Sequence, residues 1–302
     1  MRNKKRSNPN FATEEKVMKA LLIIALPIIL SNILQGVLEI VDMHFIGALG
    51  NDAISGCGIA SSVLMVLMVV NFGVNTATAA FASRAYGSKN YERVKVIMMH
   101  SLYMVLIFSA VIAFIGMFFS KNIMYLMGAD EAVAVQGALF LKPLLMGVCV
   151  MVVLMILVTV FQSTGDSRTP MIVMIFVNIV NIILNPTFIH TLGFGVSGSA
   201  YATIASRSFG ILMMLFAMYV VKKDSPVKFP RKLTFEPHLL KDVVIVAIPA
   251  AIQSGIRSAS LLLMTAVITY AYGTIAMAAF GICGRLDMLG FMIVMGICTG
   301  VS

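Results

Sequence analysis

VMKALLIIALPIILSNILQGVLEIV, residues 17–41, is the stretch that decides the class of this protein. It is apolar almost throughout, and about 20 such residues are enough to cross a bilayer as a helix. The whole chain shares this character, since 60% of its 302 residues are hydrophobic and only 12% are charged. Its mean hydropathy is +0.97, whereas a soluble domain averages about 25% charged residues. We therefore expect an all-α integral membrane protein.

Eight runs of this kind follow one another along the chain. Their approximate bounds are 17–41, 54–80, 95–119, 135–161, 171–190, 198–221, 243–270 and 275–302. Each run is continuously apolar, which predicts helices and not the alternating strands of a membrane barrel. The chain begins with a basic segment, but the run that follows is too long for a signal peptide. We expect about eight transmembrane helices, the first of them uncleaved.

The basic residues indicate how these helices are oriented. Lys and Arg gather in the N-terminal segment and in every second connection, at 84–95, at Arg168 and at 222–241, whereas Lys121 lies on the opposite side. Cytoplasmic loops carry such an excess of basic residues. We expect a cytoplasmic N-terminus and a location in the cell (cytoplasmic) membrane. The same distribution argues against the nucleic-acid binding that a net charge of +9 would suggest.

An internal repeat indicates a larger architecture. ALPIILSNILQG at 25–36 is similar to AIPAAIQSGIRS at 247–258, and three glycines recur at one constant offset: Gly50 as Gly273, Gly58 as Gly281, and Gly73 as Gly296. The repeat unit holds six spans, so both copies have the same orientation, as in parallel-repeat transporters. The second copy ends after its second span. We expect a fragment of a twelve-helix, two-lobe (6+6) protein, with a genuine eight-span protein as the alternative.

This repeat divides the chain into four parts. We expect a cytoplasmic N-terminal segment at 1–16 and a first lobe of six helices at 17–221. A cytoplasmic linker at 222–242 follows, and an incomplete second lobe with helices seven and eight occupies 243–302. Only the linker is a long connection; the others are short and rich in Gly, Asp, Asn and Ser.

Two carboxylates near the end of the first span are the main candidates for a function. Glu39 and Asp42 are three residues apart, so both lie on one face of a helix. A charge in hydrocarbon costs several kcal/mol, and such residues usually face an internal cavity and mark an ion or proton path. The alternative is that Asp42 only caps the outer end of the span at the water interface. Glu39 lies deeper, which favours a function.

The fifth span adds amide side chains. Asn178, Asn181 and Asn185 are separated by three and four residues, so they lie along one stripe of the helix. Pro186 frees a backbone carbonyl about one turn earlier. Oxygen ligands of this kind suit a hard cation such as Na⁺. The alternative is hydrogen bonding between neighbouring helices.

Other polar residues in the spans are weaker candidates. Gln35, Gln253 and Arg257 are possible cavity-lining residues. Structural ion pairing and function are equally compatible with three further charged residues, Arg207, Arg285 and Asp287. The pair Lys142-Pro143 predicts a kink with a lysine that reaches toward the interface.

The sequence contains no motif of an enzyme. GFGVSG at 193–198 fits G-x-G-x-x-G, but it follows a membrane helix instead of a strand, so we interpret it as a tight turn. None of the four cysteines forms a CxxC pair. We expect no catalytic residues, no enzyme-type cofactor and no metal beyond a coupling ion.

Four motifs together resemble the multidrug and toxin extrusion (MATE) family. They are ALPIILSNILQGVLEIVDMHFIGALG, FQSTGDSRTPMIV, NIILNPTFI and GFGVSGSAYATIASR. They follow the family's order and the resemblance covers the whole chain. It implies twelve helices in two lobes and an antiporter that exports organic cations and other drugs, driven by H⁺ or Na⁺. The implied partners are a drug substrate and the lipid bilayer, and the implied state is a monomer.

The resemblance also implies an ion site. The family's functional residues fall on Asp42, Asn181, Asn185 and Thr203, and a bound Na⁺ would be held by Asp42, Asn181 and Asn185. Two departures matter. Asn185 stands where many members have Asp, and Glu39 stands where many have Asn. One carboxylate is therefore lost and another gained nearby, which leaves the choice between H⁺ and Na⁺ open.

Two other interpretations remain open. One is a lipid-linked oligosaccharide flippase of the same superfamily, for which we expect more cationic residues in the cavity. The other is a non-transporting remnant. We expect the 302-residue chain by itself to be inactive in transport, because the counterparts of the third to sixth spans are missing from the second copy of the repeat.

Overall fold

The computed structural model describes residues 9–221, 227–229 and 236–260, with the isolated residues 263, 264, 267, 290 and 294; side chains are described from residue 24 onward. Over these ranges the chain is helical and contains no strand, which confirms the predicted all-α class. Most of the predicted eighth span, with Arg285 and Asp287, lies outside the described residues.

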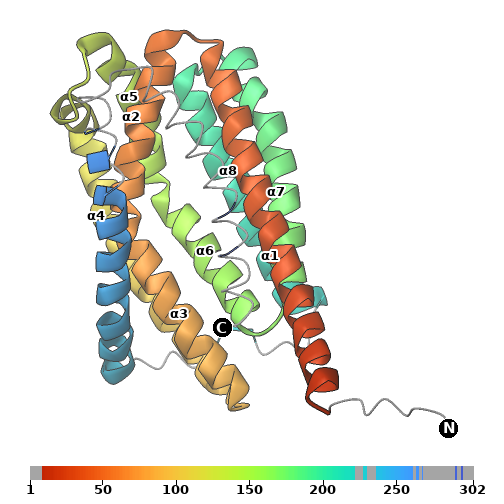
Figure 1. Cartoon of the computed structure of the whole chain (residues 1–302). Coiled ribbons are helices and arrows are strands. Elements are labelled where there is room, and N and C mark those ends of the chain that lie inside the picture. The colour runs from red at the N-terminus through yellow and green to blue at the C-terminus, as the bar shows by residue number, and fades with distance from the viewer. Residues whose placement is uncertain are drawn as a thin grey trace.

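The helices stand side by side in a bundle (Figure 1). In chain order they are α1 (Pro9–Gly47), α2 (Asn51–Leu67), α3 (Val69–Gly87), α4 (Tyr91–Leu126), α5 (Glu131–Met146), α6 (Val148–Ser163), α7 (Arg168–Pro186), η1 (Thr187–Thr191), α8 (Val196–Phe216) and η2 (Ala217–Val221). A further helix spans Pro237–Ser260. The α3–α4 and α6–α7 turns lie at the end of the bundle where α1 begins (Figure 1), so these two basic connections share one end.

The number of membrane-spanning helices agrees with the sequence over the described range. Five described helices are long and apolar enough to cross a membrane, or up to seven spans if each of two bent pairs counts as one. The bent pairs are α2–α3 and α5–α6. In chain order these seven spans correspond to the first seven predicted runs. The division into two lobes stays a prediction.

The break between α5 and α6 has a physical cause in the sequence. The chain bends by 52° between the two helices, at Gly147, four residues after Pro143. A proline inside a helix donates no hydrogen bond and displaces the carbonyl four residues earlier, which is that of Leu139. The Ser197 hydroxyl of α8 donates to this carbonyl at 2.8 Å. The predicted kink at Lys142-Pro143 is therefore present, with its bend displaced to Gly147.

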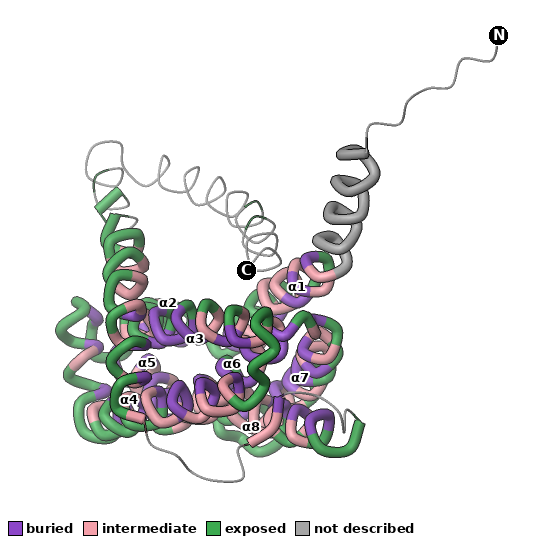
Figure 2. The backbone as a smooth tube through the Cα atoms, turned by 90° about the horizontal axis from the view of Figure 1, so that it is seen from below, coloured by how far each residue is buried: buried purple, intermediate pink, exposed green. Residues whose placement is uncertain are grey.

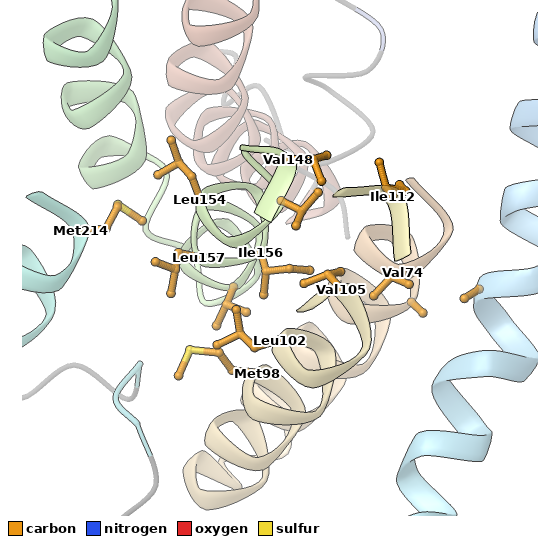
Figure 3. Close-up of a cluster of buried hydrophobic side chains, with 14 of the residues drawn as sticks. Val74, Met98, Leu102, Val105, Ile112, Val148, Leu154, Ile156, Leu157 and Met214 are labelled. Atoms are coloured by element: carbon orange, nitrogen blue, oxygen red, sulfur yellow. The ribbon is translucent and has the colours of Figure 1, made fainter. Parts of the chain in front are cut away.

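The core of the bundle is organised around α6. Figure 2 shows α6 inside the ring of the other helices, and its side chains Leu154, Ile156 and Leu157 are at most 1% exposed. In the close-up of Figure 3 these residues face Met98, Leu102 and Val105 of α4 and Met214 of α8. The outer surface is different, because large apolar side chains of α4 and α8 are exposed there, among them Ile107 at 69% and Leu212 at 65%.

A close contact between glycines sets the distance between α2 and α5. A Cβ added at Gly56 would lie 2.6 Å from the backbone nitrogen of Gly137 and 2.8 Å from the Val133 carbonyl oxygen. Real Cβ atoms do not approach backbone this closely, so only glycine allows the two helices to pack at this distance. Small residues are used in this way where membrane helices cross.

The start of the helix at Pro237–Ser260 is held against α4 by Glu236. Its carboxylate pairs with Arg93 at 2.5 Å, and its backbone N–H donates to Nε2 of His100 at 2.8 Å. The other ring nitrogen of His100 contacts the Val96 carbonyl at 2.8 Å. Since Nε2 accepts, the proton of the neutral ring sits on Nδ1 and points to Val96.

We predict that Gly56→Ala destabilises the chain by about 1–3 kcal/mol, because the added methyl group overpacks the α2–α5 contact. Gly58→Ala on the same helix is the matched control, since a Cβ there meets nothing within 4 Å; it should be neutral or slightly stabilising. Thermal unfolding of both variants in the same detergent measures the difference. Equal stability of the two variants would contradict the proposed contact.

Candidate functional site

A polar cluster lies where α1, α7 and α8 come together, and these three helices stand side by side in Figure 1. Asp42, near the end of α1, accepts a hydrogen bond from the side-chain amide of Asn185 on α7. Asn185 is fully buried and Asp42 half-buried. Two predicted site residues that are 143 positions apart in the sequence are thus in direct contact.

Asn181, one turn before Asn185 on α7, connects α7 to α8. Its side-chain amide donates to the hydroxyls of Thr203 and Ser206, both at 3.4 Å. These hydroxyls donate their own protons to the backbone carbonyls of Ser199 and Thr203. Their lone pairs therefore face the amide, and Asn181 is oriented with its N–H₂ group toward α8. The predicted residues Asn181 and Thr203 are brought together, and Ser206 joins them.

Several polar atoms of this cluster are buried without a partner among the described residues. They are Oδ1 of Asn181, Oδ1 of Asn185, both side-chain atoms of Asn178 and the hydroxyl of Ser199. A buried polar atom left unpaired costs about 1–3 kcal/mol, so a cluster of them indicates a site for water or a ligand. The unpaired amide oxygens are acceptors of the kind that hard cations prefer. No group of three or more His, Cys, Asp or Glu suited to a metal occurs in the described part of the chain.

Glu39 and Arg207 supply the remaining charges. Glu39 is exposed on α1 and forms a side-chain hydrogen bond with Gln35. Arg207 follows Ser206 on α8 and interacts electrostatically with both Glu39 and Asp42. Among the described residues no ion-pair contact joins Arg207 to either carboxylate, so the attraction acts across a gap. The three side chains carry a net charge of −1 when all are ionised.

The sequence named Arg207 without deciding between structural ion pairing and function, and it did not single out Ser206. Nothing in the residues directly next to Ser206 marked it as a candidate. A signal was present, because Thr203, Ser206 and Arg207 are three and four residues apart on α8 and therefore share one face. The sequence alone does not say which element this face opposes.

The candidates in the Pro237–Ser260 helix lie elsewhere. Gln253 and Arg257 are exposed there, and this helix packs against α3, where a Cβ on Gly73 would lie 2.4 Å from the carbonyl oxygen of Ala247. In Figure 1 it stands beside α3 and α4, on the opposite side of the bundle from α1, α7 and α8. The structure does not bring Gln253 and Arg257 to Asp42.

A second polar network between α3, α4 and α6 was missed by the sequence analysis. Thr159 of α6 donates to Asn75 at 2.8 Å, and the amide of Asn75 donates to the Asn71 carbonyl at 3.0 Å. Thr78 donates to Ser101 of α4 at 2.7 Å. The signal was the i, i+4 spacing of Asn71 and Asn75 in an apolar run. These hydrogen bonds join α3 to α4 and to α6. Of the polar side-chain atoms in this network, Oδ1 of Asn71 is buried without a partner among the described residues.

An all-helical bundle with an apolar outer surface and a buried polar cluster defines the class, a multi-pass membrane protein. The family model MatE matches residues 27–187, which is more than half of the chain. The chain therefore belongs to the MatE family.

Similar proteins agree with this membership. The chain is 30% identical over 283 residues to the probable multidrug resistance protein YoeA of Bacillus subtilis, covering 91% of this chain and 60% of that protein. It is 28% identical over 290 residues to the multidrug export protein MepA of Staphylococcus aureus, covering 94% and 63% respectively. The chain thus spans about three fifths of the length of these curated relatives.

Solved structures share the fold. A MOP superfamily transporter from Pyrococcus furiosus superposes with a TM-score of 0.85 at 26% identity, over 93% of this chain and 62% of that one. A multidrug resistance MATE family transporter in its outward-facing conformation gives a TM-score of 0.86 at 26% identity, over the same shares of the two chains.

We predict that Asn178→Leu leaves the stability unchanged or raises it by about 1–2 kcal/mol, because the amide has no partner among the described residues and leucine has a similar shape. Asn181→Leu is the comparison, and it should destabilise, since it leaves the hydroxyls of Thr203 and Ser206 without their donor. Thermal unfolding of both variants in a buffer without Na⁺ tests this. If Asn178→Leu destabilises as much as Asn181→Leu, the amide of Asn178 has a structural partner.

Proposed function

We propose that this chain contains the cation-coupling site of a secondary active efflux transporter, which exchanges H⁺ or Na⁺ for organic cations and other drugs. The relatives named above are a multidrug resistance protein and a multidrug export protein. The observation that carries the proposal is the contact between Asp42 and Asn185, beside amide oxygens that have no partner among the described residues.

The coupling rests on the electrostatics of this cluster. Glu39, Asp42 and Arg207 together hold one unit of negative charge, so one monovalent cation neutralises the site. A proton would bind to a carboxylate oxygen of Asp42, and Na⁺ would in addition use the free oxygens of Asn181 and Asn185. Burial favours the neutral form of such a site, so an occupied cluster packs differently from an empty one.

Exchange follows when the two conformations differ in their affinity for the cation. A ligand shifts an equilibrium only by its differential affinity for the two states. Cation binding to the conformation open to the outside would favour release of the drug on that side. The organic cation would then be taken up from the cytoplasm when the cluster is empty and negative. The two cations compete for one net charge, and no direct contact between them is required.

Arg207 has a defined role in this scheme as an internal counter-charge. It lowers the negative charge of the cluster and thereby limits how tightly the coupling cation is held. A site that binds its cation too tightly does not release it to the cytoplasm. Arg207 therefore favours turnover over tight binding.

The membrane arrangement is part of the proposal. The two described basic connections, α3–α4 and α6–α7, are at one end of the bundle (Figure 1), and this end faces the cytoplasm by the positive-inside rule. The N-terminus is then cytoplasmic, the protein lies in the cell membrane, and a monomer is sufficient for exchange.

We predict that Asp42→Asn abolishes drug resistance in susceptible cells that express the transporter, because no ionisable group then remains at the Asn185 contact. Asp52→Asn is the matched control, since Asp52 is exposed in the first turn of α2. Immunoblots of membranes must show equal amounts of both variants. Full resistance with Asp42→Asn would rule out Asp42 as the coupling residue.

We predict that Arg207→Gln tightens cation binding by roughly tenfold, which corresponds to about 1.4 kcal/mol, because the cluster then carries two negative charges. The shift of the thermal unfolding midpoint with Na⁺ concentration, and separately with pH, measures this affinity and identifies the ion. Arg168→Gln, at the exposed start of α7, is the control. An unchanged or weaker response with Arg207→Gln would contradict the counter-charge role.

A further inference from the structure

A groove opens between α5 and α8, on a different face of α8 from the polar cluster. It consists of a cavity of about 750 Å³ and a neighbouring cavity of about 620 Å³ that share Ser197, Tyr201 and Ile204. Tyr201 and Thr203 are two residues apart on α8, so they point about 200° away from each other. The helix thus separates the groove from the Asp42 cluster, and the inference below does not depend on the proposed function.

The floor of the groove is the break between α5 and α6. A Cβ added at Gly147 would lie 2.4 Å from Cδ1 of Ile204, so α8 approaches the break closely. The bond from Ser197 to the Leu139 carbonyl, which Pro143 frees, crosses from α8 to α5 here. The groove is therefore shaped by the packing of α8 against the α5–α6 bend.

The walls of the groove are apolar and exposed. Val135, Leu139 and Met146 on α5 are 38%, 48% and 46% exposed, and Phe194 and Tyr201 on the other side are 51% and 44% exposed. In a membrane protein such surface contacts lipid chains or another apolar ligand. The groove is open along its length and suits a flexible chain.

Two lysines line the larger cavity at the end remote from the basic connections. Lys121 is near the end of α4, and Lys142 is in α5; both are exposed. Lys142 is about 16 Å along the helix from Glu131, the first residue of α5, at 1.5 Å per residue. It therefore lies well inside an apolar span. Within the described part of the chain it has no ion pair. A charge at this depth requires a counter-ion or access to the interface.

Lys121 is better placed for an interface. It pairs with Glu131 at 3.7 Å and lies 5.5 Å from the ring of Tyr125. About 8 Å of helix separate it from the end of α4, so it is nearer the membrane surface than Lys142. The flexible stem of Lys142 allows its ammonium group to reach toward the same level. Both lysines line the same cavity, and this is the observation that places one anion between them.

We propose that the groove between α5 and α8 binds one anionic phospholipid, with its phosphate between Lys121 and Lys142 and an acyl chain along the apolar walls. Lys142 has no ion pair among the described residues and Lys121 is paired only with Glu131, so the net positive charge favours an anionic headgroup over an organic cation. The exposed apolar walls below them require a hydrocarbon chain, which a free anion does not have. Because the lipid contacts α4, α5 and α8, it stabilises the bend between α5 and α6.

The test uses the purified 302-residue chain in a mild detergent. Dioleoylphosphatidylglycerol and dioleoylphosphatidylcholine are added separately, and bound lipid is counted by native mass spectrometry. We expect one phosphatidylglycerol per chain, retained more strongly than phosphatidylcholine, and a higher midpoint of thermal unfolding. This comparison requires no variant and is therefore independent of folding defects.

Variants then locate the site. Lys121→Gln and Lys142→Gln should each weaken phosphatidylglycerol binding about fivefold, the effect of one basic residue near an anionic membrane surface. Lys95→Gln is the matched control, because Lys95 is on α4 near the other end of the bundle and pairs with Glu92 at 2.6 Å. Leu139→Trp should fill the exposed apolar wall and also displace the lipid.

Three results would overturn the proposal. Equal retention of the two lipids would remove the selection for an anionic headgroup. An equal loss of binding in Lys95→Gln would mean that only the overall charge matters. Binding of glycerol 3-phosphate as strongly as of the phospholipid would identify a site for a free anion, in which the apolar groove has no part.

Discussion

A bilayer offers no water to a buried polar group, and the rest of this structure depends on that constraint. Backbone groups are satisfied within continuous helices, and the carbonyl freed by Pro143 is satisfied by Ser197 of another helix. The side chains of Asn75, Thr78 and Thr159 follow the same rule between α3, α4 and α6. Against this background, atoms of Asn178, Asn181 and Asn185 gather at the polar cluster without a partner among the described residues, whereas the second network has one such atom, Oδ1 of Asn71.

Breaks in two parts of the bundle determine where these unpaired atoms lie. One is the bend between α5 and α6, and the other is the π-type turn after α7. The bend at Gly147 directs α6 into the centre of the bundle, where it packs against α4 and α8 (Figure 3). The helix α7 ends at Pro186, and the wider turn of η1 begins at Thr187, two residues after Asn185. Such π-type turns occur often at functional sites, because they displace the side chains next to them. The polar cluster is therefore at a point where the helix geometry is locally irregular.

Positive charges within the spans are compensated in two ways. Arg207 interacts electrostatically with two carboxylates of α1 and belongs to an internal cluster whose net charge is −1 when all three groups are ionised. Lys142 faces outward, and the described residues offer it no carboxylate. The first arrangement leaves room for one cation inside the protein, and the second requires an anion from the membrane. The same physical cost of an uncompensated charge leads to both proposals.

The sequence by itself determined the class, the first seven spans and the family, because continuous apolar runs and short ordered motifs are local properties. It also indicated Asp42, Asn181, Asn185 and Thr203, on the basis of spacing and resemblance. Only the tertiary structure decided which faces meet. It brought Asp42 to Asn185, added Ser206 and Arg207, and kept Gln253 and Arg257 away on the Pro237–Ser260 helix beside α3. The reason is that a helical period tells which residues share a face, whereas the partner of that face depends on packing between segments far apart in the chain.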